Sequence, residues 1–179
     1  MEDFGNLFRL DGKVAIVTGG TKGLGRAIAI GMAQFGADIA IADRRIDKAD
    51  EVVDGVRAAG RKIILIQTDI SQKDQVQKMA DRVVEALGRI DILVNNAGTS
   101  FRAPAVTFGQ EDFERIIDVN LVGTFLCSQA AAQRMIESER SGSMIHISSI
   151  AGVVGVPHTI AYSASKGGVT QMTRALAME

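Results

Sequence analysis

Short, continuous apolar runs alternate along the whole chain with longer stretches of helical periodicity. The apolar runs cover residues 14–17, 39–42, 63–66, 90–94 and 144–147. Runs of this kind are typical of parallel strands that are buried on both faces. Strands that alternate with helices, joined by right-handed crossovers, predict an α/β fold with a doubly wound parallel sheet that helices cover on both faces.

Helical periodicity fills the intervals between these runs. We expect helices over residues 26–35, 47–59, 71–87 and 111–137, and a last helix that begins near Ala161 and still continues at Glu179. Gly36 ends the first of these helices. Ser71 precedes Asp74 by three residues, which predicts a capping box at the start of the third helix.

Length, charge and cysteine content narrow the class of protein. A chain of 179 residues suits a single domain, expected over residues 1–179, and a net charge of -1 indicates neither nucleic acid nor an anionic membrane as a partner. Cys127 is the only cysteine, so we expect no disulfide. His146 and His158 are the only histidines, so we also expect no zinc cluster built from cysteine and histidine. Glu2 and Asp3 argue against a signal peptide, and no stretch is long enough to span a bilayer, so we expect a cytoplasmic protein.

A glycine-rich segment, T-G-G-T-K-G-L-G at residues 18–25, lies between the first apolar run and the first helix. Glycines let the backbone approach a pyrophosphate closely, and the helix start offers free N–H groups and a positive dipole end. Asp43 ends the second apolar run, where a carboxylate can accept hydrogen bonds from both hydroxyls of an adenosine ribose. The alternatives are a turn chosen for tight packing and an ordinary turn aspartate at a strand end.

Four polar side chains form a candidate catalytic group. Tyr162, the only tyrosine, and Lys166 share one face at the start of the last helix, where the cation would favour the phenolate by about 4 kcal/mol at about 4 Å. Ser149 follows the fifth apolar run, at the ligand-binding edge of such a sheet. Asn120 has apolar neighbours, which indicates a buried polar group rather than one that faces solvent.

Taken together, these motifs resemble those of the short-chain dehydrogenase/reductase family. The glycine spacing T-G-x-x-x-G-x-G, the N-N-A-G string at residues 95–98, and the 13-residue offset from Ser149 to Tyr162 all match the family in order and spacing, and the likeness runs over residues 12–179. The resemblance implies a Rossmann-type fold and an NAD(P)-dependent oxidoreductase that interconverts a secondary alcohol and a ketone. It also implies cofactor contacts at Gly19, Thr21, Lys22, Gly23, Leu24, Gly25, Asp43, Arg44, Asp69, Ile70, Asn96, Ala97, Gly98, Tyr162 and Lys166.

The resemblance assigns one role to each of the four polar residues. Tyr162 exchanges a proton with the substrate oxygen, and Lys166 favours the phenolate and binds the nicotinamide ribose. Ser149 orients the substrate oxygen. Asn120 holds a water that links Lys166 to solvent.

Family members run to about 250 residues, larger than a typical domain. The chain is therefore expected to be truncated at its C-terminus, without the family's last strands and substrate lid. The rival hypothesis is a nucleotide-binding fragment without turnover.

Substrate and cofactor preference follow from smaller signals. Residues 7–15 are similar to the opening of bacterial sugar-acid and polyol dehydrogenases, and also of reductases of 3-oxoacyl thioesters. We favour a polyol, sugar or sugar acid. Asp43 favours NAD, because a carboxylate repels the 2′-phosphate of NADP, whereas Lys22, Arg44 and Arg45 would attract it.

The resemblance also implies a homotetramer. In the family, the long fourth helix and the tyrosine-bearing helix pack against their mates in a second subunit. Here these helices carry the apolar residues Leu121, Val122, Phe125, Leu126, Val169, Met172 and Leu176. The alternative is that both helices are buried in a monomeric core.

Overall fold

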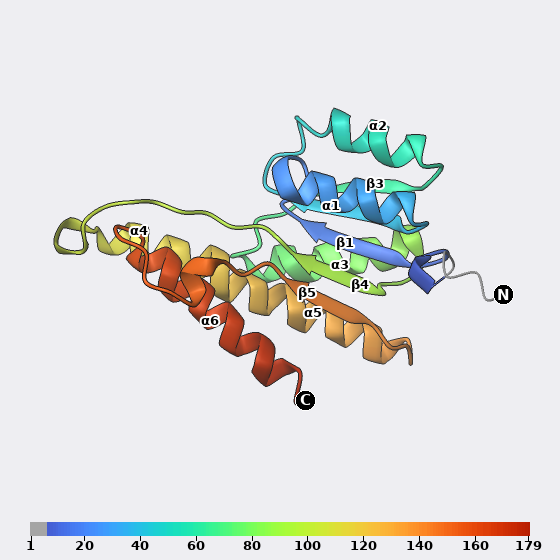
Figure 1. Ribbon diagram of the computed structural model, residues 1–179. Coiled ribbons are helices and arrows are strands. Elements are labelled where there is room, and N and C mark those ends of the chain that lie inside the picture. Colours follow the sequence, from blue (N-terminus) through green and yellow to red (C-terminus); the bar gives the residue numbers. More distant parts are fainter. Residues whose placement is uncertain (1–6) are drawn as a thin grey trace.

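The computed structural model describes residues 7–179, drawn in colour in Figure 1. Glu2 and Asp3, which argue against a signal peptide, lie outside the described residues. An all-parallel five-stranded sheet forms the centre, with the strand order β3-β2-β1-β4-β5. Its strands are β1 (Val14–Thr18), β2 (Asp38–Asp43), β3 (Ile63–Gln67), β4 (Ile92–Asn95) and β5 (Ser143–His146). The predicted parallel α/β fold is therefore confirmed.

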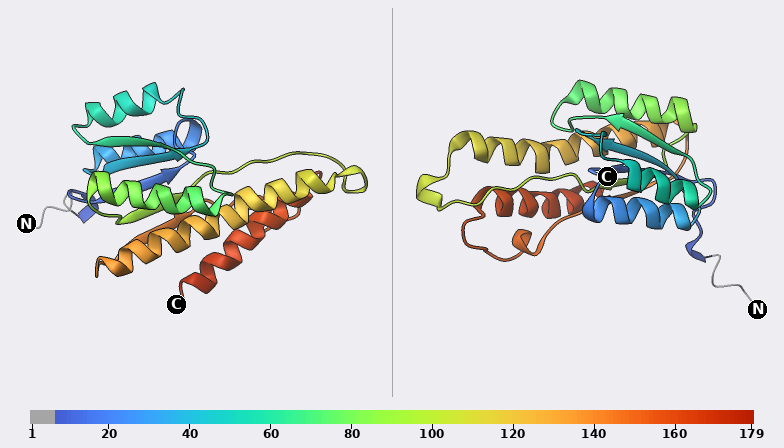
Figure 2. Two further views of the ribbon diagram at one scale, coloured as in Figure 1. Left: turned by 180° about the vertical axis from the view of Figure 1, so that it is seen from behind. Right: turned by 90° about the horizontal axis from the view of Figure 1, so that it is seen from above.

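Helices cover both faces of the sheet. The helices are α1 (Gly23–Gln34), α2 (Asp50–Ala58), α3 (Lys73–Leu87), α4 (Gln110–Ile117), α5 (Gly123–Glu137) and α6 (Ile160–Leu176), with short 3₁₀ turns η2 (Ala105–Thr107) and η4 (Ile150–Gly152). Apolar side chains of α1 and α2 pack on one face, and those of α3 and α5 pack on the other. Figures 1 and 2 show α4 and α5 as one long rod with α6 beside it. Within residues 7–179, no helix is long and apolar enough to cross a membrane.

The strand register brings the functional loops to one edge of the sheet. Thr18 pairs with Ala42, and Asn95 pairs with His146, so the carboxyl ends of neighbouring strands lie at similar heights. Each parallel strand then opens into its loop at this edge, where ligands bind in folds of this kind. The segments that follow β1, β2, β3 and β4 therefore meet in space.

The predicted helix over residues 111–137 is present but not uniform. A π-helical turn, η3 (Asp118–Val122), separates α4 from α5 without breaking the rod. Asn120 lies in this turn and is fully buried, as its apolar neighbours predict. Such π turns are rare and occur often at functional sites.

Two details of the predicted helices are wrong. Ser71 forms no capping box, because its backbone N–H and its hydroxyl both donate to Asp69 Oδ1, at 3.0 and 2.7 Å, and α3 begins only at Lys73. The last helix ends at Leu176 rather than continuing to Glu179, where an i→i−3 bond from Met178 tightens the final turn.

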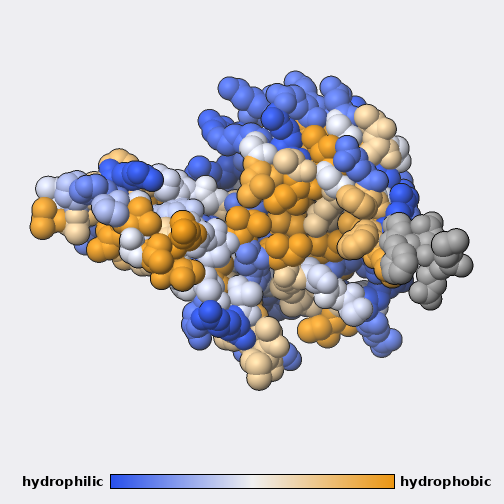
Figure 3. All heavy atoms as spheres, in the orientation of Figure 1, coloured by the Kyte–Doolittle hydropathy of each residue, from blue (hydrophilic) through white to orange (hydrophobic). Residues whose placement is uncertain are grey.

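The helical cover of the sheet is incomplete at β5 within the described residues. Ile145 pairs with Val94, so its side chain lies on the face of the sheet that α1 and α2 cover elsewhere. There it is 43% exposed. Figure 3 shows hydrophobic surface gathered over this part of the sheet. The interior nearer α3 and α5 is closed and holds Cys127, whose thiol pKa burial raises to about 12.

A buried carboxylate ties β1 to β4 at the opposite edge of the sheet. Asp91 Oδ2 accepts from the Val14 N–H at 2.9 Å, and Oδ1 pairs with Arg89 and, at 3.6 Å, with Lys13 Nζ. Its backbone also bonds to Val14 O at 3.0 Å and to Ser143 N at 2.9 Å. One residue thus connects three strands.

Replacing Asp91 with alanine is expected to lower the free energy of unfolding by about 2–3 kcal/mol, because a buried N–H loses its charged acceptor. Urea unfolding measures this loss. Asp91→Asn is the matched control: its amide oxygen can still accept from Val14, so it should lose clearly less. Equal losses in the two variants would contradict the role of this hydrogen bond.

Candidate active site

Two glycines of the loop after β1 allow backbone contacts that a side chain would block. Gly19 has a φ of 64°, and a Cβ there would lie 2.9 Å from the Cα of Ala97. A Cβ on Gly25 would overlap the carbonyl oxygen of Gly19 and the amide nitrogen of Asn96. The glycine loop and the N-N-A-G segment therefore touch at distances that only glycine permits.

Asn96 and Thr18 fasten these two segments together. The Asn96 side chain donates to the carbonyl oxygens of Thr18 and Gly19, at 2.9 and 3.0 Å. In return, the Thr18 hydroxyl oxygen accepts from the backbone N–H groups of Asn96 and Ala97, each at 3.0 Å. These reciprocal bonds give a structural reason for both the threonine and the second asparagine of the motifs.

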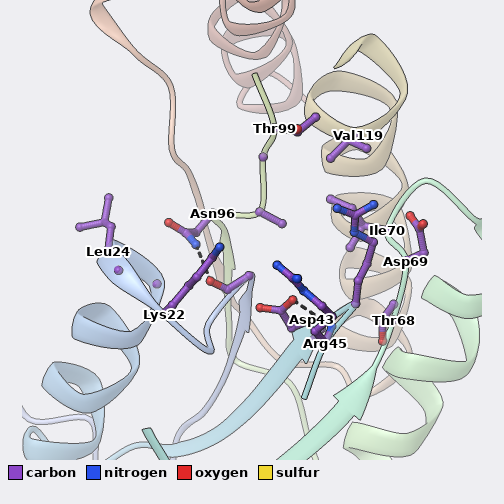
Figure 4. A pocket seen from close by; sticks show the side chains of 17 residues that line it. Lys22, Leu24, Asp43, Arg45, Thr68, Asp69, Ile70, Asn96, Thr99 and Val119 are labelled. Atoms are coloured by element: carbon purple, nitrogen blue, oxygen red, sulfur yellow. Dashed lines mark hydrogen bonds between the residues drawn. The ribbon is translucent and has the colours of Figure 1, made fainter. Parts of the chain in front are cut away.

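A pocket of about 370 Å³ opens where these loops meet (Figure 4). Most of the predicted cofactor residues line it, namely Gly19, Lys22, Gly23, Leu24, Gly25, Asp43, Arg44, Asp69, Ile70, Asn96, Ala97 and Gly98. The predicted residues Thr21, Tyr162 and Lys166 are not part of its lining. Lining residues that sequence reasoning missed are Ala42, Thr68, Thr99 and Val119, and Arg45, which is expected from the sequence only to attract a 2′-phosphate, also lines the pocket. Each of these residues adjoins one that the sequence analysis named, so proximity to the motif residues is the signal that could have identified them.

The start of α1 forms one wall of the pocket. Lys22 is the N-terminal cap residue, has extended backbone geometry, and makes no side-chain cap hydrogen bond. It lines the pocket together with the first residues of the helix, Gly23 to Gly25. Uncapped N–H groups and the positive dipole end therefore face the pocket, which suits an anionic group such as a pyrophosphate.

Asp43 lies at another wall, held by hydrogen bonds. The Thr21 hydroxyl donates to Asp43 Oδ2 at 2.7 Å, and the Arg45 N–H donates to Oδ1 at 3.3 Å. Figure 4 shows Lys22 and Arg45 near this carboxylate. The wall thus offers one fixed carboxylate among cations, and each carboxylate oxygen keeps lone-pair capacity for a further donor.

Lys166 and Tyr162 lie together on α6. Lys166 Nζ is 5.9 Å from the centroid of the Tyr162 ring, donates to the carbonyl oxygen of Ile147 at 2.6 Å, and is largely buried. Burial lowers the pKa of Lys166 below the ordinary value for lysine. The two side chains are brought together as the four-residue spacing predicts.

Asn120 connects the loop after β4 to α6. Its side chain accepts from Thr99 N at 2.8 Å and donates to Thr99 O at 2.9 Å and to Ser165 Oγ at 3.0 Å. Ser165 in turn donates to the backbone oxygen of Tyr162 at 2.8 Å. The alternative of a solvent-facing Asn120 is excluded, because its side chain is buried in a network that reaches the tyrosine.

The two serines after β5 point to different partners. Ser148 is bonded to the carbonyl oxygen of Lys166 at 3.1 Å and to the Thr170 hydroxyl at 2.7 Å. Ser149 accepts from Ala151 N at 3.2 Å, and its hydroxyl proton has no acceptor in residues 7–179. Ser148 therefore fastens α6, whereas Ser149 keeps a proton for another partner.

Gly98 joins the pocket to the catalytic group. It lines the pocket, and a Cβ on it would lie 3.3 Å from Asn120 Oδ1 and 3.8 Å from Lys166 Nζ. The pocket therefore ends close to Asn120 and Lys166, although neither residue is part of its lining. The pocket and the side chains of Asn120 and Lys166 are thus separated by one residue that carries no side chain.

Comparison with known proteins identifies this arrangement. Residues 13–179 match the family described as short chain dehydrogenase. The chain is 39% identical to 2-dehydro-3-deoxy-D-gluconate 5-dehydrogenase of Escherichia coli, over 96% of this chain and 67% of that protein. It is 37% identical to 3-oxoacyl-[acyl-carrier-protein] reductase of Thermotoga maritima, over 96% of this chain and 69% of that protein.

A solved structure of the same family has the same fold. The short chain dehydrogenase from Mycobacterium paratuberculosis bound to NAD superposes with a TM-score of 0.91 and 40% identity, over 95% of this chain and 68% of that one. The chain spans about two thirds of the length of the curated relatives it matches. Because the match extends over nearly every residue at these identities, the chain belongs to the short-chain dehydrogenase family.

Proposed function

We propose that the protein is an NAD(P)-dependent oxidoreductase that interconverts a secondary alcohol and a ketone. The observation that carries the proposal is the junction at Gly98, where a pocket suited to a dinucleotide meets Asn120 and Lys166. The structure from Mycobacterium paratuberculosis is described as bound to NAD, and the relative from Escherichia coli is named for a sugar acid. The first supports NAD as the cofactor, and the second supports a substrate among polyols, sugars or sugar acids.

The pocket fits the parts of such a cofactor. The cradle at Gly19 and Gly25, which a Cβ would fill, and the uncapped start of α1 suit the pyrophosphate. Asp43 suits the hydroxyls of the adenosine ribose. Asp69 and Ile70 line the same pocket and suit the adenine side. When bound, the nicotinamide supplies or takes up the hydride.

The chain's own residues then manage the proton and the geometry. In reduction, the Tyr162 hydroxyl donates its proton to the carbonyl oxygen of the substrate, and in oxidation the phenolate removes it. Lys166 stabilises the phenolate and binds the nicotinamide ribose. Ser149, whose hydroxyl proton has no internal acceptor in the described residues, donates to the substrate oxygen and orients it. Asn120 belongs to the path that connects Lys166 with solvent.

A second candidate is reduction of a 3-oxoacyl thioester, favoured by the likeness to the reductase of Thermotoga maritima. A third is nucleotide binding without turnover. A substrate panel of gluconate-type acids, hexitols and acetoacetyl thioesters, followed by NADH absorbance, separates the three. Turnover only with the thioester would favour the second candidate, and cofactor binding without any turnover would favour the third.

Tyr162→Phe is expected to lower kcat by at least about 10²-fold while leaving the affinity for NADH nearly unchanged, because it removes only the proton donor. Steady-state kinetics and NADH titration measure both quantities. Lys166→Ala is the contrasting variant and should lose both kcat and cofactor affinity, since we assign it two contacts. A Tyr162→Phe enzyme with near wild-type kcat would refute the assigned role.

We further propose a preference for NAD over NADP, set by Asp43. The carboxylate, fixed by Thr21 and Arg45, would face the 2′-phosphate of NADP at close range. Asp43→Ala is expected to lower the ratio of kcat/KM for NAD to that for NADP by about tenfold or more, because the repulsion disappears while Lys22 and Arg44 remain. An unchanged ratio would show that Asp43 does not recognise the ribose.

We also propose a tetramer in the cytoplasm, in which α5 and α6 pack against a second subunit. Val122 and Phe125 are 38% and 41% exposed near the start of α5, which leaves apolar surface for a partner. Val169, counted among the interface residues from sequence, is instead buried in the chain's own interior. Cys127 is also buried, which is compatible with a reducing compartment.

Sedimentation at micromolar concentration is expected to give a tetramer, and Phe125→Arg should shift the protein toward smaller species, because a charge is costly to bury in an apolar contact. Phe35→Arg is a matched control. Phe35 is 49% exposed at the end of α1, on the other face of the sheet, so this change should leave the sedimentation coefficient unaltered. A monomeric wild-type protein would contradict the proposal.

A further inference from the structure

A chain of hydrogen-bonded side chains crosses four elements behind the candidate active site. Asn95, at the end of β4, donates from Nδ2 to Ser128 Oγ on α5 at 3.1 Å. Ser128 Oγ lies 3.1 Å from His146 Nε2 on β5, and His146 Nδ1 lies 2.8 Å from Thr173 Oγ1 on α6. None of the roles assigned above uses His146.

The hydroxyl of Ser128 and the tautomer of the histidine ring are coupled by the proton count at Ser128. The Ser128 hydroxyl donates its single proton to the carbonyl oxygen of Thr124 at 2.7 Å. Its oxygen can therefore only accept from its other neighbours, and it already accepts from Asn95. While the Ser128 hydroxyl keeps its bond to Thr124, Nε2 of His146 donates to Ser128, and the ring carries a proton on Nε2.

The other ring nitrogen faces α6. Thr173 is also within 2.7 Å of the carbonyl oxygen of Val169, so its hydroxyl has two acceptors within reach. Burial lowers the pKa of His146, which favours a neutral ring with one proton. With that proton on Nε2, Nδ1 is a lone-pair acceptor, and it receives the Thr173 proton when this hydroxyl turns from the Val169 carbonyl to the ring. The ring thus donates to α5 and accepts from α6.

Hydrogen bonds of the same kind continue along α6 toward the catalytic group. Ser148 bonds to Thr170 and to the Lys166 carbonyl, and Lys166 Nζ donates to Ile147 O. Lys166, Thr170 and Thr173 follow one face of α6 at helical spacing. A polar seam therefore joins β5 to α6, with His146 at one end and Lys166 at the other.

We propose that His146 is a positioning residue, which holds α6 against β5 and α5 through its Nε2–H and Nδ1 and thereby sets the place of Tyr162 and Lys166. The part that concerns catalysis rests on the proposed oxidoreductase function. The part that concerns the ring and the seam stands on the hydrogen bonds alone.

Nuclear magnetic resonance of the ring nitrogens tests the first part on the full chain. The chain has 2 histidines, so one variant, His146→Gln, assigns both sets of signals. We expect the Nε2–H tautomer for His146 at pH 8, and we expect Ser128→Ala to remove that preference. The Nδ1–H tautomer, or the averaged signals of a free imidazole, would overturn the proposal.

Kinetics and hydrogen exchange test the second part. His146→Leu should lower kcat about tenfold, because α6 shifts and displaces Tyr162, whereas the KM for NAD(H) should rise less than kcat falls, because Lys166 moves while the other cofactor loops stay. His146→Gln is the conservative control, since its amide nitrogen can still donate to Ser128, and it should recover most of kcat. Wild-type kcat in folded His146→Leu would overturn the positioning role.

Two further measurements keep the outcomes separable. If His146→Leu does not fold, Thr173→Val removes only the link to α6 and should lower kcat about threefold, again without a matching change in KM. If the wild-type protein shows no turnover on any substrate, the oxidoreductase proposal fails by itself. Amide exchange then decides the seam: faster exchange along α6 in His146→Leu but not in His146→Gln supports it, and equal exchange in both overturns it.

Discussion

The side-chain amide of Asn96 is the contact on which the rest of the site depends. It donates hydrogen bonds to the carbonyl oxygens of Thr18 and Gly19, at the start of the glycine loop. Without this donor, two backbone acceptors would lie in a crowded region next to Gly25, where no side chain could enter to satisfy them. The same contact fixes the loop after β4 and, through Gly98, the distance from the pocket to Lys166.

The catalytic side of the site is positioned by polar contacts rather than by a closed apolar interior. The Asn120 amide is bonded to Thr99 and Ser165, and α6 is joined to β5 and the residues that follow it by hydroxyls, one ammonium group and the His146 ring. Hydrogen bonds are directional, so they define the rotation and height of a helix more closely than apolar packing does. This suits the proposed function, in which side chains from several elements meet one substrate oxygen.

Sequence reasoning could predict what depends on local pattern. Apolar runs gave the five strands, and the motif spacing gave most of the pocket lining, because parallel strands must end at one edge. It could not predict the π turn at Asn120, since that geometry depends on contacts made by Thr99 and Ser165 from distant segments. The capping box at Ser71 failed for a similar reason: Asp69, two residues earlier, offered its hydroxyl a nearer acceptor.

The burial of Cys127 gives the molecule a built-in chemical reporter. Its thiol lies in the interior between α5 and the sheet, and burial raises its pKa to about 12, so the reactive thiolate is nearly absent in the closed structure. A thiol reagent can react only after α5 separates from the sheet. The labelling rate therefore reports how often this half of the interior opens locally, under conditions in which the protein as a whole stays folded. Because the chain has 1 cysteine, the signal comes from one site alone.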